Sequence, residues 1–230
     1  KLVYDINDFD DTTTDGPYEL DTRRLAVSVI LAALENHHRL GDGVNAAEAA
    51  VRSWLHALRC WAKFDRNEFA ALEEHQHVRQ LLAQAGERNR AEFLTTLAAQ
   101  TGAAAFAFQR SRAYREVTDK ERNAIHAAMP DFLAHCLAPP DADVRQYRLE
   151  DVTARLAGTG SLGRQRYALL FDKGGPEKSF ETLRLIEWKQ ALDSALAEPL
   201  PAVSKQRARQ VFRSTCSFQL FPKRYLGYTR

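Results

Sequence analysis

The sequence has few cysteines and no long apolar run. Its 230 residues include only Cys60, Cys136 and Cys216, and no C-x-x-C pair. This spacing excludes a zinc knuckle and a thioredoxin-like motif, and it favours free thiols in a reducing compartment. No stretch approaches the roughly 18 uninterrupted apolar residues that a membrane helix needs, since even Leu25–Leu34 contains Ser28. We therefore expect a cytoplasmic chain with no membrane partner.

A strong net charge is also absent. The 32 Lys and Arg residues against 30 Asp and Glu residues leave a formal charge of +2, and 45% of the residues are apolar. This composition excludes an intrinsically disordered chain, and it excludes a protein that binds nucleic acid through bulk charge alone. A chain of this length buries roughly three quarters of its unfolded surface, so its core suffices without disulfides.

The charge is nevertheless uneven along the chain. Residues 1–21 contain seven acidic side chains and one basic one, whereas residues 199–230 contain seven basic side chains and no acidic one. The asymmetry indicates a cation site near one end and an anion-facing surface near the other, unless the two ends simply pack together. The chain opens without Met in a strand-like segment, Leu2–Ile6, so we expect a further segment upstream of Lys1.

Helical periodicity dominates the chain up to the tandem prolines at 139 and 140. Asp21 has the side chain of an N-cap and should begin the first helix. The spacing of apolar residues predicts helices over residues 22–34, 46–61, 67–85, 87–100, 103–117 and 119–137.

The period changes after the prolines. Alternating apolar residues predict strands at Val152–Leu156, Arg166–Phe171 and Leu183–Lys189, with helices over 190–198 and 204–214. The expected fold class is therefore α+β, with a mostly helical lobe over residues 1–140 and a small antiparallel sheet lobe over residues 141–230.

A glycine cluster joins the first two of these strands. Its glycines and serine are Gly158, Gly160, Ser161 and Gly163. A Rossmann turn would be followed by a helix, and a Walker A loop would carry G-K-[ST], so neither motif fits. Two interpretations stay open: an ordinary tight hairpin turn, and a kinase-type glycine loop whose backbone N–H groups cover nucleotide phosphates.

Lys189 ends the third predicted strand. A strand lysine at this place in kinases reaches the α- and β-phosphates of the nucleotide. Strand alternation places its side chain on the face opposite Trp188. The simpler interpretation is a solvated lysine on an edge strand.

Carboxylates cluster directly after the Leu2–Ile6 segment. Asp8 and Asp10 lie in the run Asn7-Asp8-Phe9-Asp10-Asp11. Oxygen ligands at a strand exit suit a hard cation such as Mg²⁺. The alternative is an acidic surface turn, because Asp favours turns and caps.

Three segments together resemble the bacterial domain of unknown function 2252 family. They are Asp5–Asp11, the stretch from Gly16 to Ser28, and the glycine cluster with Arg166, Tyr167 and the strand that ends at Lys189. The resemblance covers essentially the whole chain. Where the family pattern usually has Lys-Glu-Ala, this chain has Lys189-Gln190-Ala191, so a role for that acid does not carry over.

The resemblance implies a kinase-like fold with permuted connectivity, since the acidic motif precedes the glycine loop. It implies an ATP-dependent phosphotransferase in which Gly158, Gly160, Ser161, Gly163 and Lys189 bind ATP. Asp8 and Asp10 would then bind Mg²⁺. The catalytic base would lie upstream of Lys1, and the phosphate acceptor is an unidentified small molecule or protein.

Two alternatives come from other functional classes. One is a nucleotide-binding pseudoenzyme or regulatory module. The other is a nucleic-acid-binding module that uses the basic segment after Ser204, with Phe212, Phe218, Phe221 and Tyr225 interleaved for base stacking.

Overall fold

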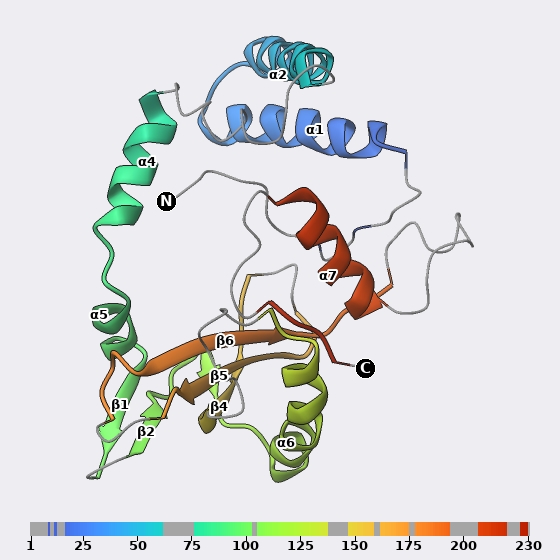
Figure 1. Ribbon diagram of the computed structural model, residues 1–230. Coiled ribbons are helices and arrows are strands. Elements are labelled where there is room, and N and C mark those ends of the chain that lie inside the picture. Colours follow the sequence, from blue (N-terminus) through green and yellow to red (C-terminus); the bar gives the residue numbers. More distant parts are fainter. Residues whose placement is uncertain are drawn as a thin grey trace.

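The chain forms two antiparallel sheets and a set of helices around and above them (Figure 1). The computed structural model describes residues 9, 12, 17–61, 76–102, 105–137, 147–158, 162–174, 178–193, 207–219 and 226–229. The helices in this part of the chain are α1 (Glu19–Glu35), α2 (Leu40–Trp61), α4 (Gln76–Gly86), α5 (Arg90–Thr95), α6 (Asp119–Ala134) and α7 (Arg207–Phe218). The fold class is α+β, as expected.

The strands form one two-stranded and one four-stranded sheet. They are β1 (Ala98–Thr101), β2 (Ala105–Phe108), β3 (Tyr114–Arg115), β4 (Arg148–Arg155), β5 (Arg166–Asp172) and β6 (Leu183–Lys189). The first sheet pairs β1 with β2, and the second has the order β3-β4-β5-β6. Because β3 precedes the tandem prolines, the four-stranded sheet takes an edge strand from the part of the chain before residue 140.

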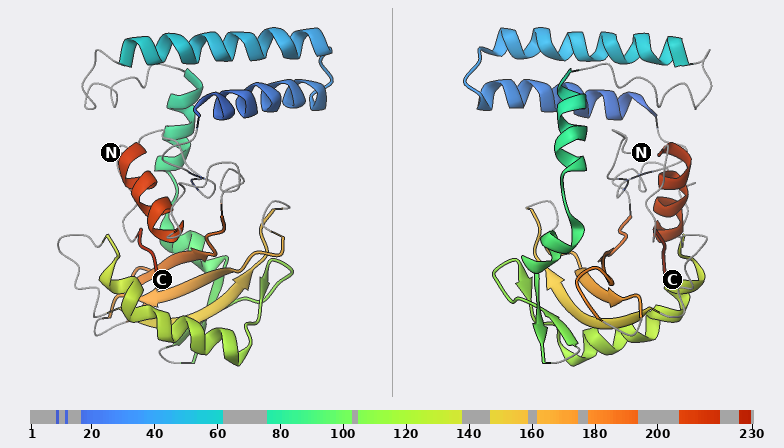
Figure 2. Two further views of the ribbon diagram at one scale, coloured as in Figure 1. Left: turned by 90° about the vertical axis from the view of Figure 1, so that its right-hand side faces the viewer. Right: turned by 60° about the vertical axis from the view of Figure 1, so that its left-hand side comes forward.

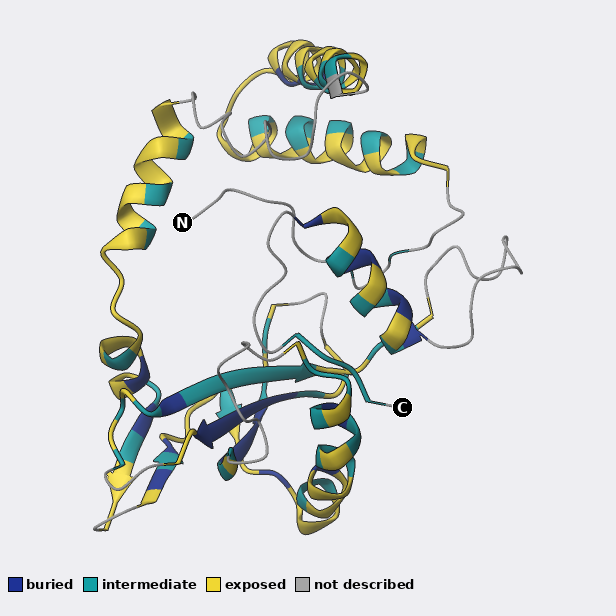
Figure 3. Cartoon of the chain, viewed as in Figure 1, coloured by how far each residue is buried: buried dark blue, intermediate teal, exposed yellow. Residues whose placement is uncertain are grey.

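The four-stranded sheet is apolar on both faces, and each face has its own core. Side chains of one face, which include Ala168, Leu170 and Leu183, pack with Leu94 and Phe106 from α5 and β2. The buried apolar side chains are concentrated in this sheet and in β2, α5 and α6, and α7 has buried polar side chains (Figure 3).

The opposite face, called the α6 face below, packs against α6. Tyr167, Leu169 and Phe171 of β5 contact Ile125 of α6 there, and Trp188 packs against the same cluster. Figure 2 shows α6 along the sheet and α7 beyond β6, and Tyr228 contacts both His135 at the end of α6 and Phe212 of α7.

α1 and α2 form a helical hairpin that packs on itself. Gly43 of α2 is buried, and a Cβ there would lie 3.2 Å from the Ala33 Cβ and 3.3 Å from the Ile30 Cα. The absence of a side chain at Gly43 therefore lets the two backbones approach closely. No described helix is both long and apolar enough to cross a membrane.

The predicted cap of the first helix is wrong. α1 begins at Glu19, its N-cap is Tyr18, and no side chain caps the backbone there. Asp21 lies instead inside the first turn, where its carboxylate is 3.8 Å from the Arg24 guanidinium at the exposed surface. An acid in the first turn is favourable toward the helix dipole without being a cap.

Two of the predicted helices are also wrong. The predicted helix over 87–100 is the short α5 followed by β1, and residues 103–117 contain β2 and β3. The Ala-Phe-Ala-Phe run of β2 alternates, with Phe106 and Phe108 buried. Gly102, at φ 72°, provides the left-handed turn that returns the chain from β1 to β2. The sequence pattern did not distinguish helix from strand here, because the alanines of this run are compatible with both helical and strand periodicity.

The remaining elements follow the predictions closely. The strands β4, β5 and β6 lie where the alternation placed them, and β6 has the predicted bounds. α1, α2, α6 and α7 match four predicted helices within a few residues. α4 covers the described part of the predicted helix over 67–85, since residues 67–75 lie outside the described residues. Residues 190–193 are not helical, and 194–200 lie outside the described residues.

Gly43→Gln should destabilise the α1–α2 hairpin, because the new side chain has to displace Ala33 and the Ile30 backbone. Gly41→Gln is the matched control, since a Cβ at Gly41 meets nothing within 4 Å. Both changes gain helix propensity of about 0.5–1 kcal/mol. We expect chemical denaturation to show a more stable Gly41 variant and a less stable Gly43 variant. Equal stabilisation by both would show that the two helices do not pack at Gly43.

Candidate functional site

The glycine cluster forms the turn of a hairpin between β4 and β5. Gly163 has φ 80°, a left-handed conformation that strains other residues, so this glycine is needed for the turn itself. A Cβ on Gly158 would meet no atom within 4 Å, so the space beside it is open. Gly160 and Ser161 lie outside the described residues.

The register of β5 and β6 places Lys189 beside the base of this turn. Lys189 pairs with Arg166, the first residue of β5. One step further, the Gln190 N–H donates to the Gln165 carbonyl at 2.8 Å, and the Gln165 N–H donates to the Gln190 side-chain oxygen at 3.1 Å. Gln190 therefore holds the turn against the end of β6.

Lys189 and Trp188 point to opposite faces of the sheet, as the alternation predicted. Trp188 packs against Phe132 of α6, with ring centroids 5.3 Å apart. The exposed Lys189 side chain therefore belongs to the face away from α6.

Glu187 binds two arginines on the same face as Lys189. Its carboxylate accepts from Arg155 at 2.6 Å and from Arg166 at 2.5 and 3.0 Å. Burial alone would raise the pKa of Glu187, but hydrogen bonds and charge from Arg166 and Arg155 outweigh it and hold that pKa below its usual value. The guanidinium charges of both arginines are thus engaged within the sheet.

α7 connects this end of the sheet to the N-terminal motif. Arg207 at the start of α7 is buried and donates to the Asp193 carboxylate at 2.8 Å, four residues after Lys189. Thr12 donates to the Ser214 hydroxyl at 3.0 Å, and the Phe9 ring stacks on Phe218 with centroids 6.2 Å apart. Asp8 and Asp10, the predicted metal ligands, lie outside the described residues.

A hollow of about 230 Å³ lies on the α6 face below the turn. Its described lining comes from the end of β4, the turn and start of β5, β3 and the first turn of α6, and includes Arg115, Glu121, Arg164 and Tyr167. Sequence reasoning missed these four residues. Thr118-Asp119-Lys120-Glu121 is, however, a visible capping-box pattern that could have fixed the start of α6.

The acid and the phenol of the hollow are held rigidly. The Glu121 carboxylate accepts from the Thr118 N–H and hydroxyl, both at 2.8 Å, and from the Tyr167 hydroxyl at 3.0 Å. The Thr118 backbone hydrogen bond is the main reason that the pKa of Glu121 lies below its usual value. Burial and the neighbouring Glu121 raise the pKa of Tyr167 to about 12, so the phenol stays protonated.

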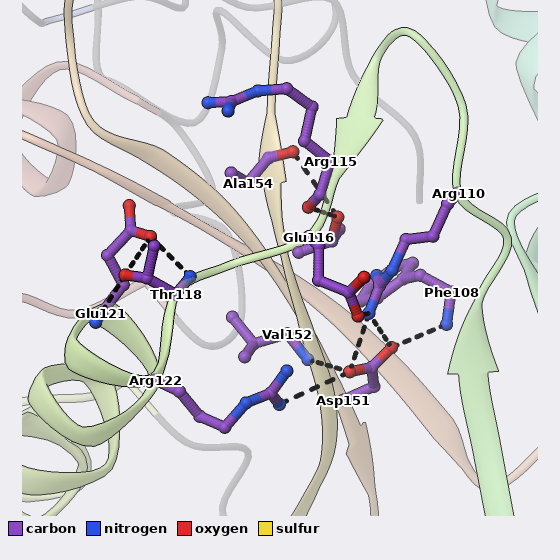
Figure 4. Close-up of polar contacts among 11 residues, drawn as sticks. Phe108, Arg110, Arg115, Glu116, Thr118, Glu121, Arg122, Asp151, Val152 and Ala154 are labelled. Atoms are coloured by element: carbon purple, nitrogen blue, oxygen red, sulfur yellow. Dashed lines mark hydrogen bonds and ion pairs between the residues drawn. The ribbon is translucent and has the colours of Figure 1, made fainter.

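A second polar cluster surrounds the Asp151 carboxylate and has a structural role (Figure 4). Asp151 accepts from the Phe108 N–H at 2.9 Å and from Arg110 at 3.2 Å, and Arg122 lies 3.7 Å away. These contacts tie β2 and α6 to β4. Across the described residues, no three His, Cys, Asp or Glu side chains are grouped so that they could hold a metal ion.

The cysteines and the basic segment near the C-terminus give weaker evidence of a functional site. Cys60, Cys136 and Cys216 are free, as expected, and burial raises the pKa of the Cys136 thiol to about 11, which disfavours a thiolate nucleophile. In the basic segment, Phe212 packs on Tyr228 with ring centroids 5.3 Å apart. Together with the Arg207–Asp193 and Phe9–Phe218 contacts, this occupies part of the segment internally.

Comparison with known families matches the whole chain, residues 1–230, to the bacterial family described as "Uncharacterized protein conserved in bacteria (DUF2252)". The chain belongs to this family. No curated protein and no solved structure matches it.

Glu187→Gln should destabilise the fold by about 1–3 kcal/mol near neutral pH, because Arg155 and Arg166 lose their charged acceptor. The control is Glu181→Gln, which affects the exposed Arg90–Glu181 pair and should cost under about 1 kcal/mol.

The pH dependence follows from the lowered pKa of Glu187. Its contribution to stability is present above the ordinary glutamate range and is lost as the pH falls through the folded-state pKa. The difference between wild type and Glu187→Gln should therefore shrink in denaturation experiments as the pH falls below the ordinary glutamate range. A difference that is constant with pH would contradict the ion-pair assignment.

Proposed function

We propose that this chain binds ATP and is part of a kinase-like, Mg²⁺-dependent phosphotransferase whose catalytic base lies upstream of Lys1. The glycine turn would cover the phosphates through its backbone N–H groups, and Lys189 would pair with them. Asp8 would hold Mg²⁺ with help from Asp10. The acceptor is a small molecule or a protein.

The observation that carries the proposal is the β5–β6 register. It aligns Lys189 with Arg166, at the end of the sheet where the glycine turn begins and ends. A strand, a glycine turn, a second strand and a third strand with a terminal lysine form the phosphate-binding arrangement of kinases. An ordinary hairpin turn would not require a cation at the end of the neighbouring strand.

The position of α7 supports a role for the acidic motif. Phe9 and Thr12, which flank Asp10 in the sequence, contact α7, and the first residue of α7 bonds to Asp193 shortly after Lys189. The motif therefore has a short structural connection to the lysine end of β6. A bound cation on this side would bridge the carboxylates and the phosphates.

Lys189→Met tests the phosphate contact. The change keeps the apolar stem and removes the ammonium, so the fold should persist while affinity for ATP with Mg²⁺ falls about tenfold or more. Titration calorimetry on the full chain measures both variants. Lys173→Met is the control, because Lys173 follows β5 at the other end of the sheet. Equal affinity for both variants would remove Lys189 from the site.

Asp8→Asn tests the metal contact separately. Removing the carboxylate charge should weaken the Mg²⁺ dependence of ATP binding, because phosphate and protein share the cation. Asp15→Asn, in the same acidic stretch, should leave that dependence unchanged. If both variants behave as wild type, Asp8 is not a ligand, whatever the outcome at Lys189.

Turnover distinguishes the enzyme from a pseudoenzyme or regulatory module. Binding that depends on Lys189 and Asp8, without phosphate transfer or hydrolysis by the full-length protein, would favour the module. A steep fall of affinity for single-stranded nucleic acid with salt, in the absence of ATP binding, would favour a nucleic-acid-binding module instead.

A further inference from the structure

We propose that the hollow on the α6 face is a second anion site, which takes a phosphate group separately from the nucleotide. The hollow lies below the same glycine turn, and Lys189 is not among its lining residues. Its lining includes four arginines and one glutamate, so the formal charge of these side chains is positive.

Two arginines of the hollow, Arg115 and the half-buried Arg164, form no ion pair within the described residues. In Figure 4, no dashed line reaches the Arg115 guanidinium. By contrast, Arg155 and Arg166, which also line the hollow, bind Glu187. Arg115 acts on Glu121 through its charge alone, which helps to lower the pKa of that acid, and no described carboxylate lies within ion-pair distance of its guanidinium. A guanidinium placed in this way beside a hollow can recruit an external anion.

The acid in the hollow does not neutralise both arginines. Glu121 accepts three hydrogen bonds, from the Thr118 backbone and hydroxyl and from Tyr167. Its position is fixed by α6 and β5, and its charge balances one guanidinium at most. The capping box and the tyrosine thus give the hollow a preformed wall, which reduces the ordering cost of binding.

The chemistry and the size select a small phosphate. A guanidinium presents a planar fork of N–H donors that matches phosphate oxygens, and two of them suit a doubly charged group. The volume of about 230 Å³ is below the roughly 300–1,000 Å³ that is typical of sites for drug-sized ligands. It therefore suits inorganic phosphate or a small phosphomonoester better than a whole nucleotide.

Calorimetric titration of the full chain with inorganic phosphate tests the site. Arg115→Gln and Arg164→Gln should each weaken phosphate binding about tenfold, since each removes a charge-assisted contact. Arg112→Gln is the matched control, because Arg112 is exposed and does not line the hollow. Lys173→Met, at a residue that follows β5 at the other end of the sheet, is a second control and should leave phosphate affinity unchanged.

Titrations with two further compounds define which ligand the hollow takes. Glycerol 3-phosphate that binds as tightly as inorganic phosphate would extend the site to phosphomonoesters, and weaker binding would restrict it to the free ion. Acetate that binds as tightly as phosphate would overturn the assignment to a doubly charged group. The proposal fails if phosphate does not bind, or if Arg112→Gln weakens it as much as the two hollow variants.

Discussion

The pairing of β5 with β6 is the contact on which the sheet and both candidate sites depend. It runs in unbroken register from Asp172 and Leu183 to Arg166 and Lys189. A slip of one residue would exchange the two faces, moving Trp188 away from α6 and turning Lys189 toward it. Glu187 opposes such a slip, because its carboxylate meets Arg155 and Arg166 only when all three side chains share a face. The ion pairs therefore specify the register, and the apolar cores on both faces supply most of the stabilisation.

The two faces of the sheet differ in what they offer at the turn. On the α6 face, the first turn of α6 brings a capping-box glutamate under β5, and the hollow forms beside it. On the other face, α5 and β2 cover the core further along the sheet, and Lys189 remains exposed at the end of β6. A single glycine turn can therefore take part in two sites without either one occupying the other's volume.

Sequence patterns predicted β4, β5 and β6 of the four-stranded sheet, because their apolar residues alternate without competing helical spacing, but not its edge strand β3. Lys189 was placed correctly at the end of β6 for the same reason. Patterns failed at β1 and β2, where alanine satisfies both periods and the tertiary contacts of Phe106 and Phe108 decide the outcome. They also failed at Asp21. An aspartate is favourable both as an N-cap and inside the first turn of a helix, and here Tyr18 is the N-cap and Asp21 lies in the first turn. Arg115 and Arg164 could not be found from spacing, because β3, α6 and the turn meet only through the fold.

The end of the sheet beside the turn carries an excess of basic side chains. Arg155, Arg166 and Lys189 against Glu187 leave a formal charge of +2 there, and the hollow, which Arg155 and Arg166 also line, adds Arg115 and Arg164 against Glu121. Gln190 holds the turn through its amide without contributing a negative charge. Under the proposed function, the phosphates would face Lys189 and the cation would face the carboxylates of the acidic motif. A ligand that carries both signs would then match this positive end of the sheet.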